Sequence, residues 1–150
     1  MDFLNIGVSY ESLTEKEQEI YHTLDDVPYG VKLATAVAGK LKQEPAALYH
    51  AHRDYCGIGL YFFEQKFTLG EVNDGMGPHP ILATFDDEAV FVEWLARQSD
   101  QSMALIVNNT YGSRFNNQTI TRLRLQWYLE EDYSPTWNAY AMYAKEKSDK

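Results

Sequence analysis

The stretch FDDEAVFVEWLA, residues Phe85–Ala96, is the clearest helix signal in the chain. It forms the first half of a longer region, Thr84–Leu129, on which the fold depends. Asp86 or Asp87 is suited to accept hydrogen bonds from the first free backbone amides, and Glu88 adds negative charge at the positive end of the helix dipole. Apolar residues then follow at spacings of three and four, which places them on one face: Phe91, Trp94 and Leu95. We therefore expect two amphipathic helices, joined by a polar, Asn-rich crossing.

Length and composition indicate a single globular domain spanning residues 1–150. Hydrophobic residues make up 45% of the chain and charged residues 23%, as in ordinary water-soluble domains. No apolar run approaches the roughly 20 residues of a transmembrane helix, and the N-terminus lacks the pattern of a secretory signal. The single cysteine, Cys56, cannot form an internal disulfide. We expect a cytoplasmic protein that does not enter membranes.

The first half of the chain predicts two helices followed by strands. Ser12 and Glu15 have capping-box spacing at the start of a helix that ends near Asp25–Asp26, and small apolar residues favour a second helix over Val31–Lys42. Gly57–Glu64, Phe67–Val72 and Ile81–Phe85 are typical of strands, with a turn at Gln65–Lys66 and a loop over Asn73–Pro80.

The second half predicts further helices. Ser99 is placed to cap a short helical turn, whereas Met103–Val107 fits a strand or a helix equally well. Thr119 is placed to cap a helix over Ile120–Glu131, with Ile120, Leu123 and Trp127 inward and with Arg122 and Arg124 in water. Ser134–Pro135 is typical of the start of a last helix. The expected fold is α+β, with about five helices packed around a small, mostly antiparallel sheet.

The net charge of −9 and pI near 4.8 bear on function. A negative field repels nucleic acid and anionic membranes, so neither is an expected partner, and it steers a basic protein toward the surface. Solubility alone explains such a charge equally well. Two acidic runs are less easily explained, because Asp25–Asp26 and Glu130–Asp132 stand at the C-terminal ends of expected helices, where the dipole disfavours carboxylates.

Residues 50–56 could carry chemistry. On a strand His50 and His52 point to one face, and Asp54 could join them at a metal ion. No further histidine or cysteine stands at ligand spacing, so polar residues at a sheet edge are the simpler interpretation. Cys56 lacks the electropositive setting of a nucleophile and is better read as a buried thiol. The pairs at Gly57–Gly59 and Gly75–Gly77 lack the remaining residues of a nucleotide-binding loop.

Phe85–Ala89, Trp94–Asp100, Phe115–Thr121 and Arg124–Leu125 together resemble bacterial immunity proteins of polymorphic toxin and contact-dependent growth inhibition systems. The resemblance implies a small, cytoplasmic, non-enzymatic protein without cofactor or bound metal. Such a protein binds a cognate toxin domain, commonly a nuclease with a basic cleft, and inhibits it stoichiometrically. The amides of Asn116–Gln118 have a structural interpretation here, because they are suited to cap the following helix.

The candidate partner-binding residues are chosen for sign and expected exposure: Asp25, Asp26, Glu71, Asp74, Glu130, Glu131, Asp132 and Tyr133. Three other functions remain open. One is a small metal-dependent enzyme using His50, His52 and Asp54. Another is an acidic nucleic-acid mimic, although the carboxylates cluster in twos and threes and are not evenly spaced. The last is an adaptor or structural subunit.

Overall fold

The computed structural model describes residues 9–43, 48–51, 57–72, 81–106 and 120–130, with only the backbone at residues 48–51, 57 and 71–72. Within these ranges the fold is α+β, as predicted, with an antiparallel sheet in the order β1-β2-β3-β4. The strands are β1 Leu48–Ala51, β2 Gly57–Phe63, β3 Lys66–Val72 and β4 Ile81–Phe85.

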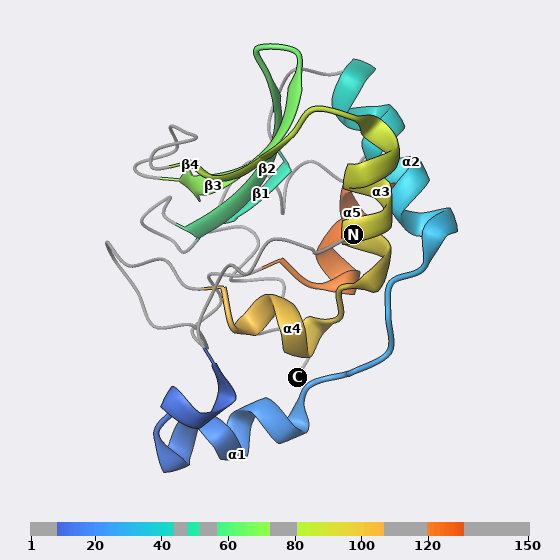
Figure 1. The fold of residues 1–150 in the computed structure, drawn as a ribbon. Helices are drawn as coiled ribbons and strands as arrows, with labels where there is room; N and C mark the ends of the chain where they lie inside the picture. The colour runs from blue at the N-terminus through green and yellow to red at the C-terminus, as the bar shows by residue number, and fades with distance from the viewer. Residues whose placement is uncertain (1–8, 44–47, 52–56, 73–80, 107–119, 131–150) are drawn as a thin grey trace.

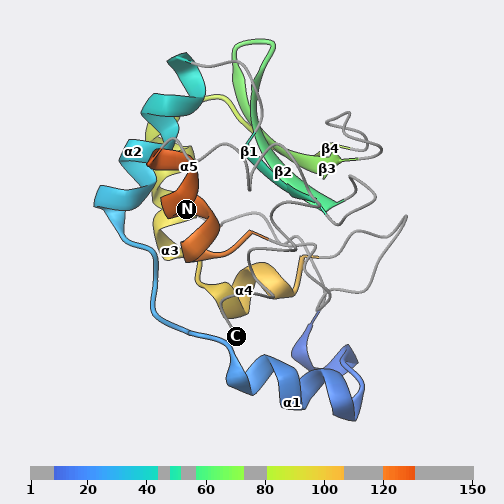
Figure 2. The same cartoon turned by 180° about the vertical axis from the view of Figure 1, so that it is seen from behind.

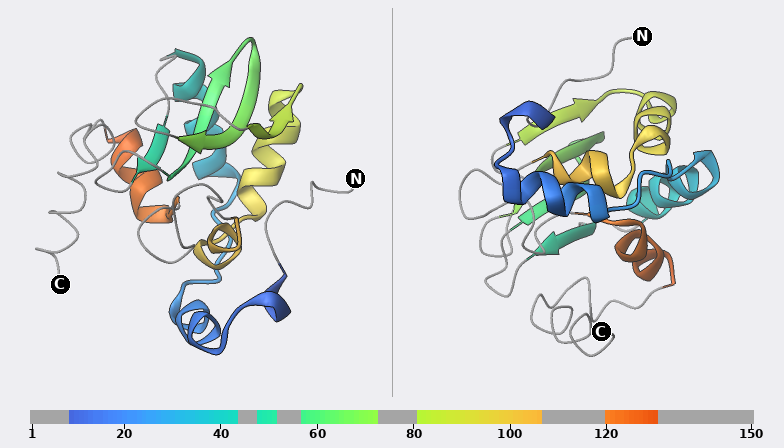
Figure 3. Two further views of the ribbon diagram at one scale, coloured as in Figure 1. Left: turned by 90° about the vertical axis from the view of Figure 1, so that its left-hand side faces the viewer. Right: turned by 90° about the horizontal axis from the view of Figure 1, so that it is seen from below.

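Three helices pack on one face of this sheet (Figures 1 and 2). They are α2, Val31–Gln43, α3, Glu88–Arg97, and α5, Arg122–Leu129. Helix α2 lies between the other two and contacts β2, while α5 contacts β1 and α3 contacts β4. A short helix, α4 (Asp100–Ala104), follows α3. The 3-10 turn η1, Tyr10–Ser12, and helix α1, Glu15–Thr23, lie at the end of the molecule remote from the sheet (Figure 3).

An aromatic cluster joins the sheet to α3. Phe67 stacks on Phe91 with 4.5 Å between the ring centroids, and Phe85 contacts both Phe91 and Trp94. The inward residues of β2 and α2 complete this core, including Ile58, Leu60, Val37 and Leu41. Phe91, Trp94 and Leu95 are buried on the face that their spacing predicts, so the central helix and its inner face are confirmed.

Two predicted positions in the first half of the chain were wrong by one or two residues. The capping box of α1 uses Thr14 and Glu17 in place of Ser12 and Glu15. Leu13 is buried just before the cap, which fixes the helix start two residues later than expected. The β2–β3 turn is centred on Glu64–Gln65, because both have positive φ and Lys66 already pairs with Phe63.

Helix α5 departs more from its prediction. Its N-cap is Thr121, not Thr119. Ile120 and Trp127 are buried as predicted, but Leu123 is 46% exposed and Arg124 only 4% exposed, so these two residues were assigned to the wrong faces. Arg124 is buried along its whole length, and its Nη1 donates to the Thr121 hydroxyl oxygen at 3.5 Å. The start of the ambiguous Met103–Val107 segment is helical, with Met103 and Ala104 ending α4. The predicted loop over 73–80 and the predicted helix after Ser134 lie outside the described residues.

Candidate partner-binding surface

The most acidic part of the described surface is the segment 11–26, here called the acidic arm. It carries six carboxylates, five of them exposed, and only Lys16 as a counter-charge, so more than half of the net charge of −9 lies in 16 residues. The carboxylates are those of Glu11, Glu15, Glu17, Glu19, Asp25 and Asp26.

The acidic arm contributes little to the core. None of the residues of α1 is buried. The arm is tied to α4 mainly through Gln101, whose amide nitrogen donates to the carbonyl of Asp25 at 3.0 Å and whose side chain donates to the carbonyl of Tyr21 at 3.2 Å. Tyr10, Tyr21 and His22 contact one another, and the Tyr10 hydroxyl lies 2.7 Å from His22 Nε2. Leu13 of the arm is buried but does not belong to the main core cluster. The arm therefore presents mainly carboxylates and aromatic rings.

A polar clasp fixes the linker that follows the arm. The Tyr29 hydroxyl donates to Asp100 Oδ1 at 2.9 Å, and the same oxygen accepts from the amide of Arg122 at 2.8 Å. The Arg122 guanidinium in turn donates to the carbonyls of Val27 and Pro28 at 3.0 and 2.9 Å and lies over the Tyr29 ring. We call Tyr29, Asp100 and Arg122 the clasp. It holds the linker against α4 and the start of α5.

Within the clasp the Tyr29 side chain is buried, whereas Asp100 and Arg122 are partly exposed, and the electrostatics of Tyr29 agree with a structural role. Burial raises the pKa of the Tyr29 phenol well above its usual range. The negative charge of Asp100, and its acceptance of the phenol hydrogen bond, raise the pKa further, against smaller opposing effects of Arg122 and Arg124. Tyr29 is therefore a neutral donor at every physiological pH, which suits a permanent tie and not an acid–base catalyst.

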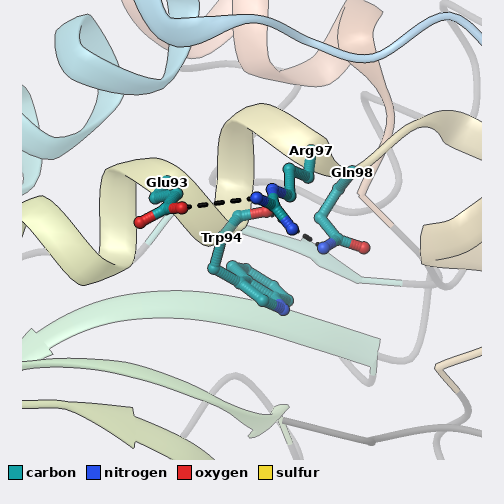
Figure 4. A network of polar contacts seen from close by, with 4 residues as sticks. All are labelled: Glu93, Trp94, Arg97 and Gln98. Carbon is teal, nitrogen blue, oxygen red and sulfur yellow. Dashed lines mark hydrogen bonds and ion pairs between the residues drawn. The ribbon is translucent and has the colours of Figure 1, made fainter. Parts of the chain in front are cut away.

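A groove of about 730 Å³ lies between the start of α2 and the outer strip of α3. Apolar or small residues form most of its lining, together with one exposed ion pair, Glu93–Arg97 at 3.4 Å. Figure 4 shows this pair along the helix while the Trp94 indole points toward the sheet. The lining residues are Pro28, Gly30, Val31, Ala89, Val92, Glu93, Ala96 and Arg97. We call it the α2–α3 groove.

The structure separates the candidates predicted from sequence. Asp25 and Asp26 are exposed at the end of the acidic arm, where Asp25 Oδ1 also accepts from the amide of Val27 at 2.8 Å. Glu130 is exposed at the C-cap of α5, at the opposite end of that helix from Arg122, about 12 Å away at 1.5 Å per residue. The backbone of Glu71 pairs with Ile58 in the sheet. Asp74, Glu131, Asp132 and Tyr133 lie outside the described residues.

The predicted metal-ligand residues are only partly described. The backbone of His50 pairs with Ile58 in the sheet, whereas His52, Asp54 and Cys56 fall in an undescribed range. Elsewhere in the described ranges, no three histidine, cysteine, aspartate or glutamate residues gather as metal ligands would. Nor does any described helix have both the length and the apolar character needed to cross a bilayer.

Sequence reasoning missed the clasp and the groove. Tyr29 and Asp100 are 71 residues apart, and Asp100 and Arg122 are 22 apart, so no local pattern signals their meeting. Comparison with models of protein families, with curated proteins and with solved structures finds no match.

Proposed function

We propose that this protein is an immunity protein that binds a basic toxin domain and neutralises it by stoichiometric contact. The observation that carries the proposal is the acidic arm, which concentrates six carboxylates and one lysine on a segment whose helix buries no residue. Asp25 and Asp26, predicted from sequence as contacts, belong to it. The resemblance of the central helices to immunity proteins supports the same function.

The arm suits rapid capture of a cationic surface. Clustered exposed charge raises the rate of encounter with an oppositely charged partner, and this effect weakens as salt screens the field. Tyr10 and Tyr21 supply rings beside the carboxylates, and aromatic residues are favoured anchors at protein interfaces. The expected complex therefore combines fast, salt-sensitive association with slow dissociation.

The proposal is tested with a basic toxin domain encoded in a reading frame next to the gene. The activity of that toxin should fall to zero at one equivalent of the protein. In stopped-flow measurements at low salt, Glu15→Lys/Glu19→Lys should slow association by about tenfold or more. A matched variant, Glu64→Lys/Asp86→Lys, makes the same charge change at exposed sites near the β2–β3 turn and should have a much smaller effect.

Two results would overturn the proposal. A toxin that remains fully active with excess protein would remove the inhibitory function. Equal slowing by the two double variants would show that only net charge matters, and that the acidic arm is not the contacting surface.

A further inference from the structure

The α2–α3 groove begins where the acidic arm ends. Asp26 is two residues before Pro28, a groove residue, so their Cα atoms are at most about 7 Å apart. Val27 and Val31, at the same end, are 56% and 65% exposed, and they are two of the large apolar side chains that the described surface leaves in water. An apolar hollow and a pair of exposed carboxylates thus adjoin on one surface.

The wall of the groove is held in place before any partner arrives. The amides of Tyr29 and Gly30 donate to the carbonyls of Gln98 and Ala96 at 2.8 and 3.0 Å, which ties the linker to the end of α3. Arg122 holds the carbonyls of Val27 and Pro28 from the other side. A preformed wall lowers the entropy lost when a side chain enters, so the groove is suited to binding.

The charges around the groove favour a cationic occupant. Glu93 and Arg97 in the lining pair with each other and cancel. The Arg122 guanidinium at the Pro28 carbonyl has the Asp100 carboxylate beside it in the clasp. Asp25 and Asp26, which precede Pro28 by three and two residues, are exposed and belong to the acidic arm. The volume of about 730 Å³ lies within the roughly 300–1,000 Å³ range of binding pockets and readily accepts an aromatic side chain.

We propose that the α2–α3 groove accepts an aromatic side chain of the cationic partner, with neighbouring basic residues of that partner facing Asp25 and Asp26. This inference rests on the proposed function and assigns its apolar anchor. The arm speeds encounter, and the groove slows release, because buried aromatic anchors dominate the dissociation step.

The groove is tested by titrating the ¹⁵N-labelled protein with three capped tripeptides, Lys-Trp-Lys, Lys-Ala-Lys and Glu-Trp-Glu, at millimolar concentration. Lys-Trp-Lys should shift the amide signals of Val31, Val92 and Ala96, and should bind at least about tenfold more tightly than either of the others. Ala89→Trp, which fills the groove from an exposed position, should abolish those shifts. Ala36→Trp, at an exposed position of α2 outside the groove, should retain them.

The other outcomes separate the two proposals. Shifts of Asp25 and Asp26 by Lys-Ala-Lys, without groove shifts by Lys-Trp-Lys, would overturn the groove and leave the cationic partner of the arm in place. If Glu-Trp-Glu and Lys-Trp-Lys bound the groove equally well, the inference that its occupant is cationic would be overturned. Persistence of the shifts in Ala89→Trp would place the peptide elsewhere.

Discussion

Two glycines at the start and in the middle of α2 should respond in opposite ways to the same substitution. Gly30 has φ of +92°, so Gly30→Ala is strained although no atom lies within 4 Å of the added methyl group, and should cost about 1 kcal/mol of unfolding free energy. Gly39 is helical and equally unobstructed, so Gly39→Ala should stabilise by about 0.5–1 kcal/mol. Urea unfolding at 25 °C measures the unfolding free energy of both variants. Changes of the same sign would contradict the different backbone conformations of the two glycines.

Residue-level features were predictable where one face of a helix is strongly apolar. Phe91 and Trp94 are buried as their spacing indicates. In α5 the sequence RLRLQWYL gives no such contrast, and tertiary packing decided that Arg124 enters the interior while Leu123 stays in water. Glu64 and Gln65 adopt positive φ without the glycine or asparagine that marks this turn, so no local signal distinguished it.

Loss of the capping box of α1 should destabilise that helix alone, whereas loss of the capping box of α4 should destabilise the whole protein. Thr14→Ala removes a bond worth about 1 kcal/mol, but α1 buries no residue, so faster hydrogen exchange of the α1 amides is expected with an unchanged Tm. Ser99→Ala should lower the Tm by about 2–4 °C for each kcal/mol lost, because α4 anchors Met103 in the core. Exchange mass spectrometry and calorimetry measure the two effects.

Ser12→Ala is the control for α1, since Ser12 is the residue that the sequence pattern favours as the cap. Its hydroxyl donates to the carbonyl of Ser9 and makes no bond to an α1 amide. Exchange in α1 should therefore stay at the wild-type rate. If Ser12→Ala accelerated hydrogen exchange of the α1 amides as much as Thr14→Ala does, Ser12 would be the cap, as the sequence pattern predicts.

Element types were predictable because each has a local cause. Apolar periodicity gave α2 and α3, and runs rich in large and β-branched residues between turn formers gave β2, β3 and β4. Boundaries depend on which of two neighbouring hydroxyls reaches an amide. Ser12 and Thr14 both have a glutamate three residues later, so the capping-box spacing does not choose between them. Thr119 and Thr121 both have an arginine there, so the spacing does not single out Thr121 either.

At the scale of the whole molecule, the fold class and the net charge were available from the sequence, while the surface that uses the charge was not. The acidic arm became visible only once α1 was seen to lie away from the sheet without buried residues. The α2–α3 groove needs the antiparallel packing of two helices, fixed by Gly30 against Ala96 at one end and by the Lys42–Glu88 pair at the other. Such long-range geometry is not encoded in any single stretch of the chain.

The clasp predicts a distinctive loss of stability at high pH. The pKa of Tyr29 is raised in the folded protein, whereas the unfolded chain releases this proton near pH 10. Above pH 10 the unfolded state holds fewer protons than the folded state, so Tyr29 lowers the unfolding free energy by about 1.4 kcal/mol per pH unit. Below pH 10 the contribution of Tyr29 does not change with pH. Urea unfolding between pH 9 and 12 gives the unfolding free energy as a function of pH. In Tyr29→Phe this free energy should fall less steeply with pH than in the wild type, by up to that amount.

Asp100→Asn separates the two causes of this pH dependence. Burial is the larger cause and survives the substitution, so the alkaline slope should remain, although stability at neutral pH falls by about 1–3 kcal/mol as the charged acceptor of two hydrogen bonds is lost. Equal alkaline slopes in the wild type and Tyr29→Phe would show that the phenol titrates in the folded protein. The linker that forms one wall of the α2–α3 groove would then be open to water at Tyr29 and not held by a buried phenol.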